Sequence, residues 1–427
     1  MRGSPREISL WRFGDGSWSY TLIPEPDINT ELARQSCARA HGTTHCVSFQ
    51  PNGLEENWNQ DRYVVHEYTL PNGSVWKLRA IFDGHMGHDT VNYVAEHLST
   101  KVQDRLNNAF PKLDPDSVSS LLTEVITTFD YSLLVDLLSG IPSESQLSSL
   151  TEYEVQNILG GDHRSKVLRS MQGTTVIIAL TNPDNEDLWV ASLGDSYAVL
   201  GIQSSYDDRR ELMFLSSYHN GLNPRERERL IRGHPNEPEV LSRNRVLGGL
   251  AVTRALGDYP YKLPSIYTDR VFLHASQSRN QRELIDSVSN RNLTPPYISN
   301  VPDVKYVDLK SKRLGNSPSG LNTDKKGNNI ALRMCLLMCT DGLVDLYEDE
   351  LETKEPLDIF PRCMDVACAV PTARYCKTST TDHCDNVALS ILRDALGGTD
   401  IEKVSAMMTV EMQEKWMDDT TILFEFL

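Results

Sequence analysis

The chain has 427 residues, of which 39% are hydrophobic, enough for a packed core in one large domain or in two or three smaller ones. Its 42 basic and 59 acidic residues give a formal net charge of −17. This balance argues against a nucleic-acid-binding surface, which needs a basic patch. No apolar run approaches the roughly 20 residues that span a bilayer, so we expect a soluble intracellular protein without a membrane span.

The first residues leave two compartments open. They lack the long apolar segment of a secretory signal, and they match an Arg-rich mitochondrial presequence poorly. We therefore expect either the cytoplasm or the mitochondrial matrix. The eight cysteines are unremarkable for a reducing compartment.

In chain order, residues 1–50 show no sustained hydrophobic period, and we expect an extension that packs on the main body. Residues 51–427 are expected to form one domain. Strand patterns at 63–65 and 75–82 flank the turn Pro71-Asn72-Gly73, which predicts a β-hairpin. Apolar residues at three- and four-residue steps predict amphipathic helices over 89–110 and 118–138.

Further strands are predicted at 174–180 and 188–202, on either side of a turn. Asn223 and Pro224 predict the start of a charged helix. Residues 263–329 show little periodicity and are expected to form a polar insertion that ends in a loop. Thr399 starts a capping-box pattern that predicts the last helix, and two glycines before it end the preceding helix. Hairpin turns in place of regular strand-helix alternation predict an α+β domain with antiparallel sheets and segregated helices.

Acidic residues follow three of the predicted strands. Asp83-Gly84-His85 comes directly after an apolar run, the same apolar-Asp-Gly pattern returns at Asp341, and Asp418 precedes the last strand. A lone Asp-Gly is most often a turn. If the three strands lie side by side, however, their carboxylates converge, and oxygen ligands of this kind suit hard divalent cations. The repetition predicts a metal site at these strand ends.

These pieces belong to an ordered set of motifs that covers about residues 55–427. The set comprises Gln60-Asp61-Arg62, Asp83-Gly84-His85, Gly173-Thr174-Thr175, Leu193-Gly194-Asp195-Ser196, the segment 245–258, Asp341-Gly342-Leu343-Val344-Asp345 and Asp418-Asp419-Thr420-Thr421. It resembles the metal-dependent serine/threonine protein phosphatases of type 2C. Segments 218–220, 294–297 and 386–398 are most similar to the pyruvate dehydrogenase phosphatase branch of that family, in its fungal form.

The resemblance implies an αββα four-layer sandwich, two antiparallel sheets flanked by helices, with two Mg²⁺ or Mn²⁺ ions in a cleft at one end. By motif, Asp83 bridges the two ions and Gly84 offers its carbonyl to one of them. Asp341 and Asp418 hold the other ion. Asp61 lies in the motif that supports the first ion.

The resemblance also implies a third, weaker metal site at Asp195 and Asp345, although Asp195 could equally shape a turn. A water that bridges two ions about 3.5–4 Å apart loses its proton easily and can attack phosphorus in line. His85 is the motif-matched general acid for the leaving serine or threonine oxygen. Nearby, Arg254 and Asp258 are expected to form a buried pair or to shape a loop.

Three positions depart from the family pattern. Gln60 stands where the family has Glu, and as a ligand it is weak because it brings no charge. Glu56 stands where many members have an Arg that grips phosphate, and Met86 replaces a small residue. Arg62 is a possible substitute for phosphate contact. The leading hypothesis is a monomeric Mg/Mn-dependent phosphatase that acts on a phosphoprotein, and the branch resemblance implies a pyruvate dehydrogenase-like substrate. The alternative is a weak or inactive regulatory protein with the same fold.

Overall fold

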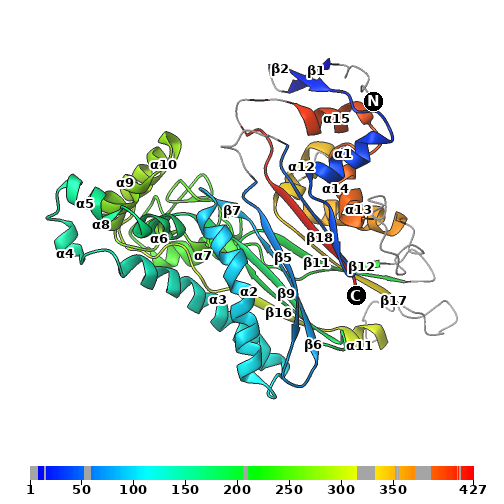
Figure 1. Ribbon diagram of the computed structural model, residues 1–427, viewed down its shortest axis with the longest axis horizontal. Coiled ribbons are helices and arrows are strands. Elements are labelled where there is room, and N and C mark those ends of the chain that lie inside the picture. Colours follow the sequence, from blue (N-terminus) through cyan, green and yellow to red (C-terminus); the bar gives the residue numbers. More distant parts are fainter. Residues whose placement is uncertain are drawn as a thin grey trace. The chain divides into compact units, whose positions relative to one another are not determined.

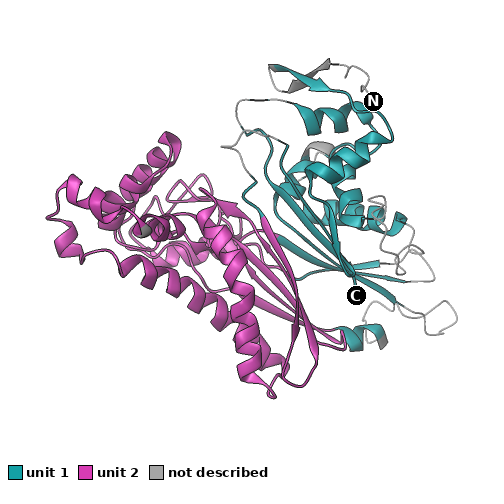
Figure 2. Cartoon of the chain, viewed as in Figure 1, with its two compact units in different colours: residues 1–61, 197–215, 309–427 teal, residues 62–196, 216–308 magenta. Residues whose placement is uncertain are grey.

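The structure is a computed structural model that describes residues 8–13, 16–51, 59–204, 210–314, 332–351, 353, 355–370, 386–410, 412 and 415–427. It consists of two compact units (Figure 2). Unit 1 comprises residues 1–61, 197–215 and 309–427, and unit 2 comprises residues 62–196 and 216–308. Each unit is built on one large antiparallel sheet, and the two are described separately.

Unit 2 contains a five-stranded sheet in the order β16-β10-β9-β6-β5. Its strands are β5 (Arg62–Thr69), β6 (Val75–Phe82), β9 (Val176–Thr181), β10 (Asp187–Leu193) and β16 (Asp303–Asp308). All neighbouring strands are antiparallel. The predicted hairpin is confirmed, because β5 pairs with β6 along their whole length.

Two long helices, α2 (Asp89–Ala109) and α3 (Pro115–Leu138), pack on the sheet of unit 2 (Figure 1). Both were predicted. Helix α3 begins three residues before the predicted start, because Asp114 accepts a hydrogen bond from the Ser117 N–H and Pro115 takes the first helical position. The apolar faces of both helices are buried in one core with Leu78 of β6.

The rest of unit 2 consists of short elements. A small three-stranded sheet consists of β7 (Gly84–His85), β8 (Gly173–Thr174) and β15 (Leu256–Gly257). A separate pair of short strands is formed by β13 (Leu241–Ser242) and β14 (Arg245–Val246). The short helices are α4 (Glu144–Leu147), α5 (Glu152–Ile158), α6 (Asp162–Met171), α7 (Pro224–Gly233), α8 (Ser265–Tyr267), α9 (Leu273–Ala275), α10 (Arg279–Ser289), η2 (Tyr259–Tyr261) and η3 (Thr268–Phe272). Helix α7 begins as predicted, capped by Asn223.

The segment 263–329 is more ordered than its composition predicts. Helix α10 buries Ile285 and Val288, and β16 is an edge strand of the large sheet. Three-residue helices and a π-helical turn precede α10, and these produce no long hydrophobic period for sequence analysis to detect. Most of the loop predicted at 311–329 lies outside the described residues.

Unit 1 contains a six-stranded sheet in the order β12-β11-β17-β18-β4-β3. Its strands are β3 (Arg39–His41), β4 (Thr44–Phe49), β11 (Tyr197–Ser204), β12 (Arg210–Phe214), β17 (Leu332–Cys339) and β18 (Thr420–Phe426). The helices are α1 (Asp27–Gln35), α11 (Leu309–Leu314), α12 (Gly342–Leu351), α13 (Pro356–Ala369), α14 (Val387–Ala395) and α15 (Ile401–Thr409). Helices α12 and α14 contact β18 (Figure 1).

The N-terminal segment contributes to unit 1 in two ways. Strands β3 and β4 are part of the large sheet, with β4 paired to β18. The hairpin of β1 (Ile8–Phe13) and β2 (Gly16–Thr21) continues into a segment that is hydrogen-bonded to α15: the Thr21 N–H donates to Thr409 Oγ1, and the Ile23 N–H donates to Ser405 Oγ. Residues 1–50 thus include sheet strands as well as a packed segment, and the domain boundary at 50 stays a prediction.

Two local predictions need correction. The strand expected over 188–202 is broken at Gly194, whose φ of +116° is a conformation that glycine adopts easily, and it continues as β11 in the other sheet. The cap of α15 is Asp400, which accepts a hydrogen bond from the Lys403 N–H, and not Thr399.

The α+β class, with two antiparallel sheets flanked by helices, is confirmed. Within the described ranges, no helix combines the length and apolar composition needed to cross a membrane.

Candidate functional site

Asp83 is held by its backbone at the end of β6. Its N–H donates to Thr175 Oγ1 at 3.2 Å, and its carbonyl accepts from the Thr175 N–H at 2.8 Å and from Thr174 Oγ1 at 3.0 Å. Gly84, directly after it, pairs with Thr174 across β7 and β8. The motif Gly173-Thr174-Thr175 therefore fixes the strand end and leaves the Asp83 carboxylate to other partners.

Asp195 lies beside Asp83 in unit 2. One carboxylate oxygen of each residue lies within 4.8 Å of the other, and Asp195 is only 4% exposed. Gly194, in its positive-φ conformation, turns the chain there after β10. Asn220 Nδ2 donates to Asp195 Oδ2 at 3.3 Å. Two carboxylates this close, with neutral hydrogen-bond donors around them, are an arrangement that a divalent cation stabilises.

His85 is bound by a buried carboxylate that the sequence did not point to. Its Nε2 lies 2.9 Å and 2.8 Å from the two carboxylate oxygens of Asp258, whose side chain is fully buried. Burial alone would lower the pKa of His85. The negative charge of Asp258, its hydrogen bond and the charge of Asp195 outweigh burial, and the net pKa is above the ordinary value. The pair favours the protonated imidazole that a general acid requires.

A glycine makes this contact possible. A Cβ atom on Gly173 would lie 2.2 Å from both Asp258 Oδ2 and His85 Nε2. Asp258 itself has a φ of +53°, and the preceding Gly257 donates its N–H to Asp130 Oδ1 at 2.9 Å. Lys262 Nζ is 2.9 Å from the other oxygen of Asp130. The buried ion pair thus fixes the loop that carries Asp258.

The expected pairing of Arg254 with Asp258 is wrong. Arg254 instead forms ion pairs with Glu226 at 2.6 Å and with Asp303 at 3.1 Å. Glu226 is nearly buried; burial opposes its charge, but hydrogen bonds from Arg254 and Thr253 outweigh that and lower its pKa to about 2. Arg254 thus has a structural role, as the sequence favoured, but with different partners. Arg62, considered as a phosphate contact, donates to Asn92 Oδ1 at 2.8 Å.

In unit 1, Asp61 is buried beside other acidic residues. It is 2% exposed, and its Oδ2 accepts a hydrogen bond from Thr340 Oγ1 at 2.8 Å. Burial, followed by the negative charges of Asp419 and Asp418, raises the pKa of Asp61 to about 8. A bound cation would relieve this crowding of negative charge, because an opposite charge favours the ionised form.

The two aspartates of the last motif form ion pairs with a lysine side chain. Lys415 Nζ lies 3.3 Å from Asp418 Oδ1 and 3.0 Å from Asp419 Oδ2. Asp419 is 4% exposed and also accepts from Gln50 Nε2 and from the Gln60 N–H. Asp418, by contrast, has a side chain that is half exposed. Asp419 is therefore the structural member of the pair, and Asp418 is the one accessible to a ligand.

Asp341 lies two residues after the end of β17, and α12 starts directly after it. A Cβ atom on Gly342 would lie 2.1 Å from the Asp419 carbonyl oxygen, so glycine is needed where the helix start meets β18. The backbones are further tied by the Thr421 N–H, which donates to Thr340 Oγ1. Asp345 is exposed in the first turn of α12, and its N–H donates to the Asp341 carbonyl.

The acidic residues that sequence analysis assigned to the metal site are divided between the two units. Unit 2 brings Asp83 and Asp195 together, and unit 1 brings Asp61 close to Asp418 and places Asp341 at the adjacent strand end. Sequence analysis missed the roles of Asp258, Asp419 and Lys415. The spacing of Lys415, three and four residues before the two aspartates, was a weak signal for an ion pair. Of the departures, Met86 packs against the core of unit 2 with a φ of +64°, and Glu56 lies outside the described residues.

The donor set fits divalent metal ions. It consists of carboxylate oxygens at strand ends, Asp83 and Asp195 in unit 2 and Asp61, Asp341 and Asp418 in unit 1, which are hard ligands of the kind that Mg²⁺ and Mn²⁺ prefer. The raised pKa of Asp61 is a second sign of uncompensated negative charge. Together with a histidine whose pKa is raised, such carboxylates are typical of hydrolases that act on phosphate esters with the help of metal ions.

The comparisons with known proteins give the family. Residues 57–313 match protein phosphatase 2C. A protein phosphatase 2C homolog of Schizosaccharomyces pombe is 26% identical over 86% of this chain and 76% of its own length. Mitochondrial [pyruvate dehydrogenase [acetyl-transferring]]-phosphatase 1 of Saccharomyces cerevisiae is 24% identical over 81% of this chain and 61% of its own. The solved structure of a C. elegans sex determining protein has a TM-score of 0.52 at 17% identity, covering 91% of this chain and 65% of that one.

The family match covers more than half of the chain, and the chain therefore belongs to the protein phosphatase 2C family. The members are serine/threonine protein phosphatases that in general depend on metal ions, and their substrates are phosphoproteins. The bovine mitochondrial pyruvate dehydrogenase phosphatase 1 is 30% identical over 60% of this chain, which spans only 48% of that relative. The resemblance to this family and to its pyruvate dehydrogenase branch is confirmed.

Proposed function

We propose that the chain is a phosphatase that hydrolyses phosphoserine and phosphothreonine in proteins and requires Mg²⁺ or Mn²⁺. In this proposal Asp83 would be a ligand common to two ions, Gly84 would contribute its carbonyl, and Asp61, Asp341 and Asp418 would be the further ligands. Gln60 is a weak ligand of the first ion, and Asp195 with Asp345 forms a third, weaker site. When bound, the ions activate water and neutralise negative charge on the phosphoryl group.

The observation that carries the proposal is the fixed position of Asp83 beside Asp195 and His85. Three hydrogen bonds hold the backbone of Asp83: its N–H donates to Thr175 Oγ1, and its carbonyl accepts from the Thr175 N–H and from Thr174 Oγ1. The carboxylate therefore does not have to be ordered when the ions bind, which lowers the entropic cost of binding.

The protein's own groups supply the proton for the leaving oxygen. Asp258 fixes the imidazole of His85 through Nε2 and stabilises its protonated form. The second ring nitrogen, Nδ1, then remains to donate a proton to the serine or threonine alkoxide as the P–O bond breaks. A residue in this role contributes about 10²–10⁴ in rate.

The substrate is a phosphoprotein, and we propose a pyruvate dehydrogenase-like complex. This follows from the named activity of the yeast and bovine relatives and not from any feature of the site. Such a substrate would place the protein in the mitochondrial matrix, and we propose that it acts there as a monomer. Location of a tagged full-length chain and a sedimentation measurement test the two statements separately.

Hydrolysis of a phosphothreonine peptide tests the chemistry. In excess Mn²⁺ the wild type should release phosphate from the peptide, and a metal chelator should stop this release. Asp83→Asn should lower kcat by at least about 10³-fold, because the bridging charge is lost while the fold is kept. Asp184→Asn, at an exposed turn position, is the matched control and should be fully active. Equal rates for wild type and Asp83→Asn would refute the site.

A second function, a regulatory protein that binds phosphoproteins with little catalysis, is favoured by one contact. The ammonium group of Lys415 already neutralises part of the Asp418 and Asp419 charge. Calorimetric titration with Mn²⁺ separates the two functions. Two sites support the phosphatase, and no heat of binding together with retained phosphopeptide binding supports the regulatory protein.

A further inference from the structure

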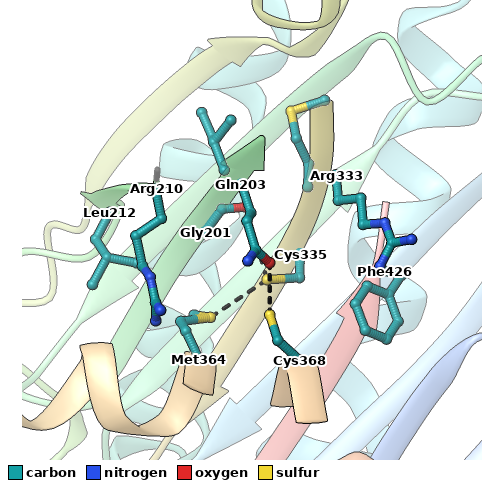
Figure 3. A pocket seen from close by; sticks show the side chains of 11 residues that line it. Gly201, Gln203, Arg210, Leu212, Arg333, Cys335, Met364, Cys368 and Phe426 are labelled. Carbon is teal, nitrogen blue, oxygen red and sulfur yellow. Dashed lines mark hydrogen bonds between the residues drawn. The ribbon is translucent and has the colours of Figure 1, made fainter. Parts of the chain in front are cut away.

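The apolar hollow between the unit 1 sheet and helix α13 is too small for an organic ligand (Figure 3). Its cavity volume is about 20 Å³, room for about one water molecule. Cys335 Sγ lies 3.4 Å from Met364 Sδ there, so sulfur atoms already fill the space. The hollow is therefore part of the packed core of unit 1.

Unit 2, by contrast, buries a carboxylate that packing does not explain. Asp130 is 1% exposed, in line with the buried Ile126, Leu133 and Leu137 of α3 at steps of three and four residues. Burying a charge costs free energy even when it is paired, and an apolar side chain in its place is often at least as stabilising. Stability alone thus gives no reason for an aspartate at this position.

Asp130 holds the chain on both sides of Asp258. Its Oδ1 accepts a hydrogen bond from the Gly257 N–H at 2.9 Å, and its Oδ2 accepts from Lys262 Nζ at 2.9 Å. The Asp130 carbonyl accepts from the Tyr259 hydroxyl at 2.7 Å. Gly257 directly precedes Asp258 and Tyr259 directly follows it, so one helix residue fixes both neighbours.

Lys262 closes the same loop on itself. Its Nζ also donates to the Ala255 carbonyl at 2.9 Å, and its side chain is only 6% exposed. Asn300 Nδ2 adds a third donor to the Asp130 carboxylate, at 3.0 Å from Oδ2. Hydrogen bonds to a charged acceptor are stronger than those to a neutral one, so this network holds segment 255–262 firmly.

Asp258 needs this support because its backbone conformation is unfavourable. Its φ of +53° lies in the left-handed region, which persists in a residue with a side chain only where the surroundings impose it. A Cβ atom on Gly257 would lie 2.2 Å from the Gln172 carbonyl oxygen, so the turn is also tightly packed. The Asp258 carboxylate lies 2.8 Å from His85 Nε2, and a change in the turn would move it away.

We propose that Asp130 is a positioning residue for proton transfer. Through Gly257 and Lys262 it holds Asp258 in the conformation that orients the imidazole of His85. The inference rests on the proposed function, in which His85 Nδ1 gives its proton to the serine or threonine oxygen as the P–O bond breaks. Asp130 itself gains and loses no proton.

The leaving group separates positioning from a purely structural role. A serine or threonine alkoxide is strongly basic and needs a proton as it leaves, whereas p-nitrophenolate is stable as an anion and leaves without one. Loss of orientation at His85 should therefore slow a phosphothreonine peptide and spare p-nitrophenyl phosphate. Damage to the fold or to the metal site should slow both substrates.

The double variant Asp130→Asn/Lys262→Met tests the proposal in excess Mn²⁺. Asp130→Asn alone would leave a buried ammonium group unpaired, whereas the double change removes both charges and should keep the fold. Its kcat for the peptide should fall at least about tenfold, with KM unchanged, and its kcat for p-nitrophenyl phosphate should stay within about twofold. Asp136→Asn/Lys101→Met makes the same two changes at other helix positions, and should leave both rates unchanged.

The outcomes separate this inference from the proposed function. Equal losses on the two substrates, full activity on the peptide, or a circular dichroism spectrum that shows unfolding would each mean that the ion pair serves only the fold, and would overturn the inference. In those cases a wild type that hydrolyses the peptide leaves the phosphatase proposal standing. A wild type that hydrolyses neither substrate would overturn both.

Discussion

The two units hold their acidic residues in different ways. In unit 2, the Asp83 N–H donates to Thr175, and Asp195 accepts a hydrogen bond from Asn220. Two cationic side chains of the same unit form ion pairs with other carboxylates, Arg254 with Glu226 and Lys262 with Asp130. In unit 1, Asp61, Asp418 and Asp419 are crowded, and Lys415 compensates part of their charge. The backbone of Asp83 and the carboxylate of Asp195 are placed by hydrogen bonds, whereas the carboxylates of Asp418 and Asp419 share the ammonium group of Lys415.

This difference shows where binding free energy is expected to come from. A carboxylate on a backbone that is already fixed by hydrogen bonds gains most from an incoming cation, because less order has to be imposed on binding. A carboxylate that shares an ammonium group gains less. We therefore expect changes in unit 2 to affect catalysis strongly and changes at Lys415 to tune metal affinity.

After Asp83→Asn, the largest effect is expected from Gly173→Ala in unit 2. The added Cβ would lie 2.2 Å from His85 Nε2 and from Asp258 Oδ2, so the two side chains must separate. Loss of a general acid costs about 10²–10⁴ in rate, and we expect kcat to fall at least about 100-fold. Phosphate release from a phosphothreonine peptide measures it.

Gly233→Ala is the matched control for this change. No atom lies within 4 Å of a Cβ at Gly233, at the end of α7, and its φ is not positive. Its kcat should equal that of the wild type. If Gly173→Ala kept full activity, the contact between His85 and Asp258 would have no role in the reaction.

An intermediate effect is expected at Glu226, which forms an ion pair with Arg254 at 2.6 Å. The folded-state pKa of about 2 lies below the ordinary 4.5. The stabilisation is therefore complete above about pH 4.5 and is lost as pH falls toward 2. The shift corresponds to about 3 kcal/mol at neutral pH. Glu226→Gln should lower the free energy of unfolding by up to that amount at pH 7 and by much less at low pH.

Urea unfolding at pH 7 and near pH 3 measures this dependence. Glu228→Gln is the control, because Glu228 lies on the same helix, is 67% exposed and pairs only with Arg232 at the surface. Its effect should be within about 0.5 kcal/mol. A loss at Glu226 that did not depend on pH would mean that packing, and not the charge, is responsible.

Strand ends and helix periods made much of this structure predictable. Apolar residues at every second position predicted the hairpin of β5 and β6, and local signals predicted the helices: apolar residues at every third or fourth position for α2 and α3, and the capping residues for α7. Asp83 and Asp341 lie at the predicted strand ends. The contact of His85 with Asp258 was not predictable, because 173 residues separate them and the loop of Asp258 is shaped by the buried ion pair of Asp130. Local patterns carry no information on such contacts.

The smallest effect is expected in unit 1, at Lys415. Its ammonium group lies 3.3 Å from Asp418 Oδ1, so a metal ion at Asp418 must share the carboxylate with it. Removing a partly exposed ion pair changes free energy by about 1 kcal/mol, or about fivefold in a binding constant. Lys415→Gln should therefore bind Mn²⁺ about fivefold more tightly in a calorimetric titration, while Lys101→Gln on α2, equally a loss of one exposed charge, should not change it. Weaker Mn²⁺ binding by Lys415→Gln would mean that the lysine positions Asp418 for the metal, and the contrast between the two units would then be one of geometry and not of competing charge.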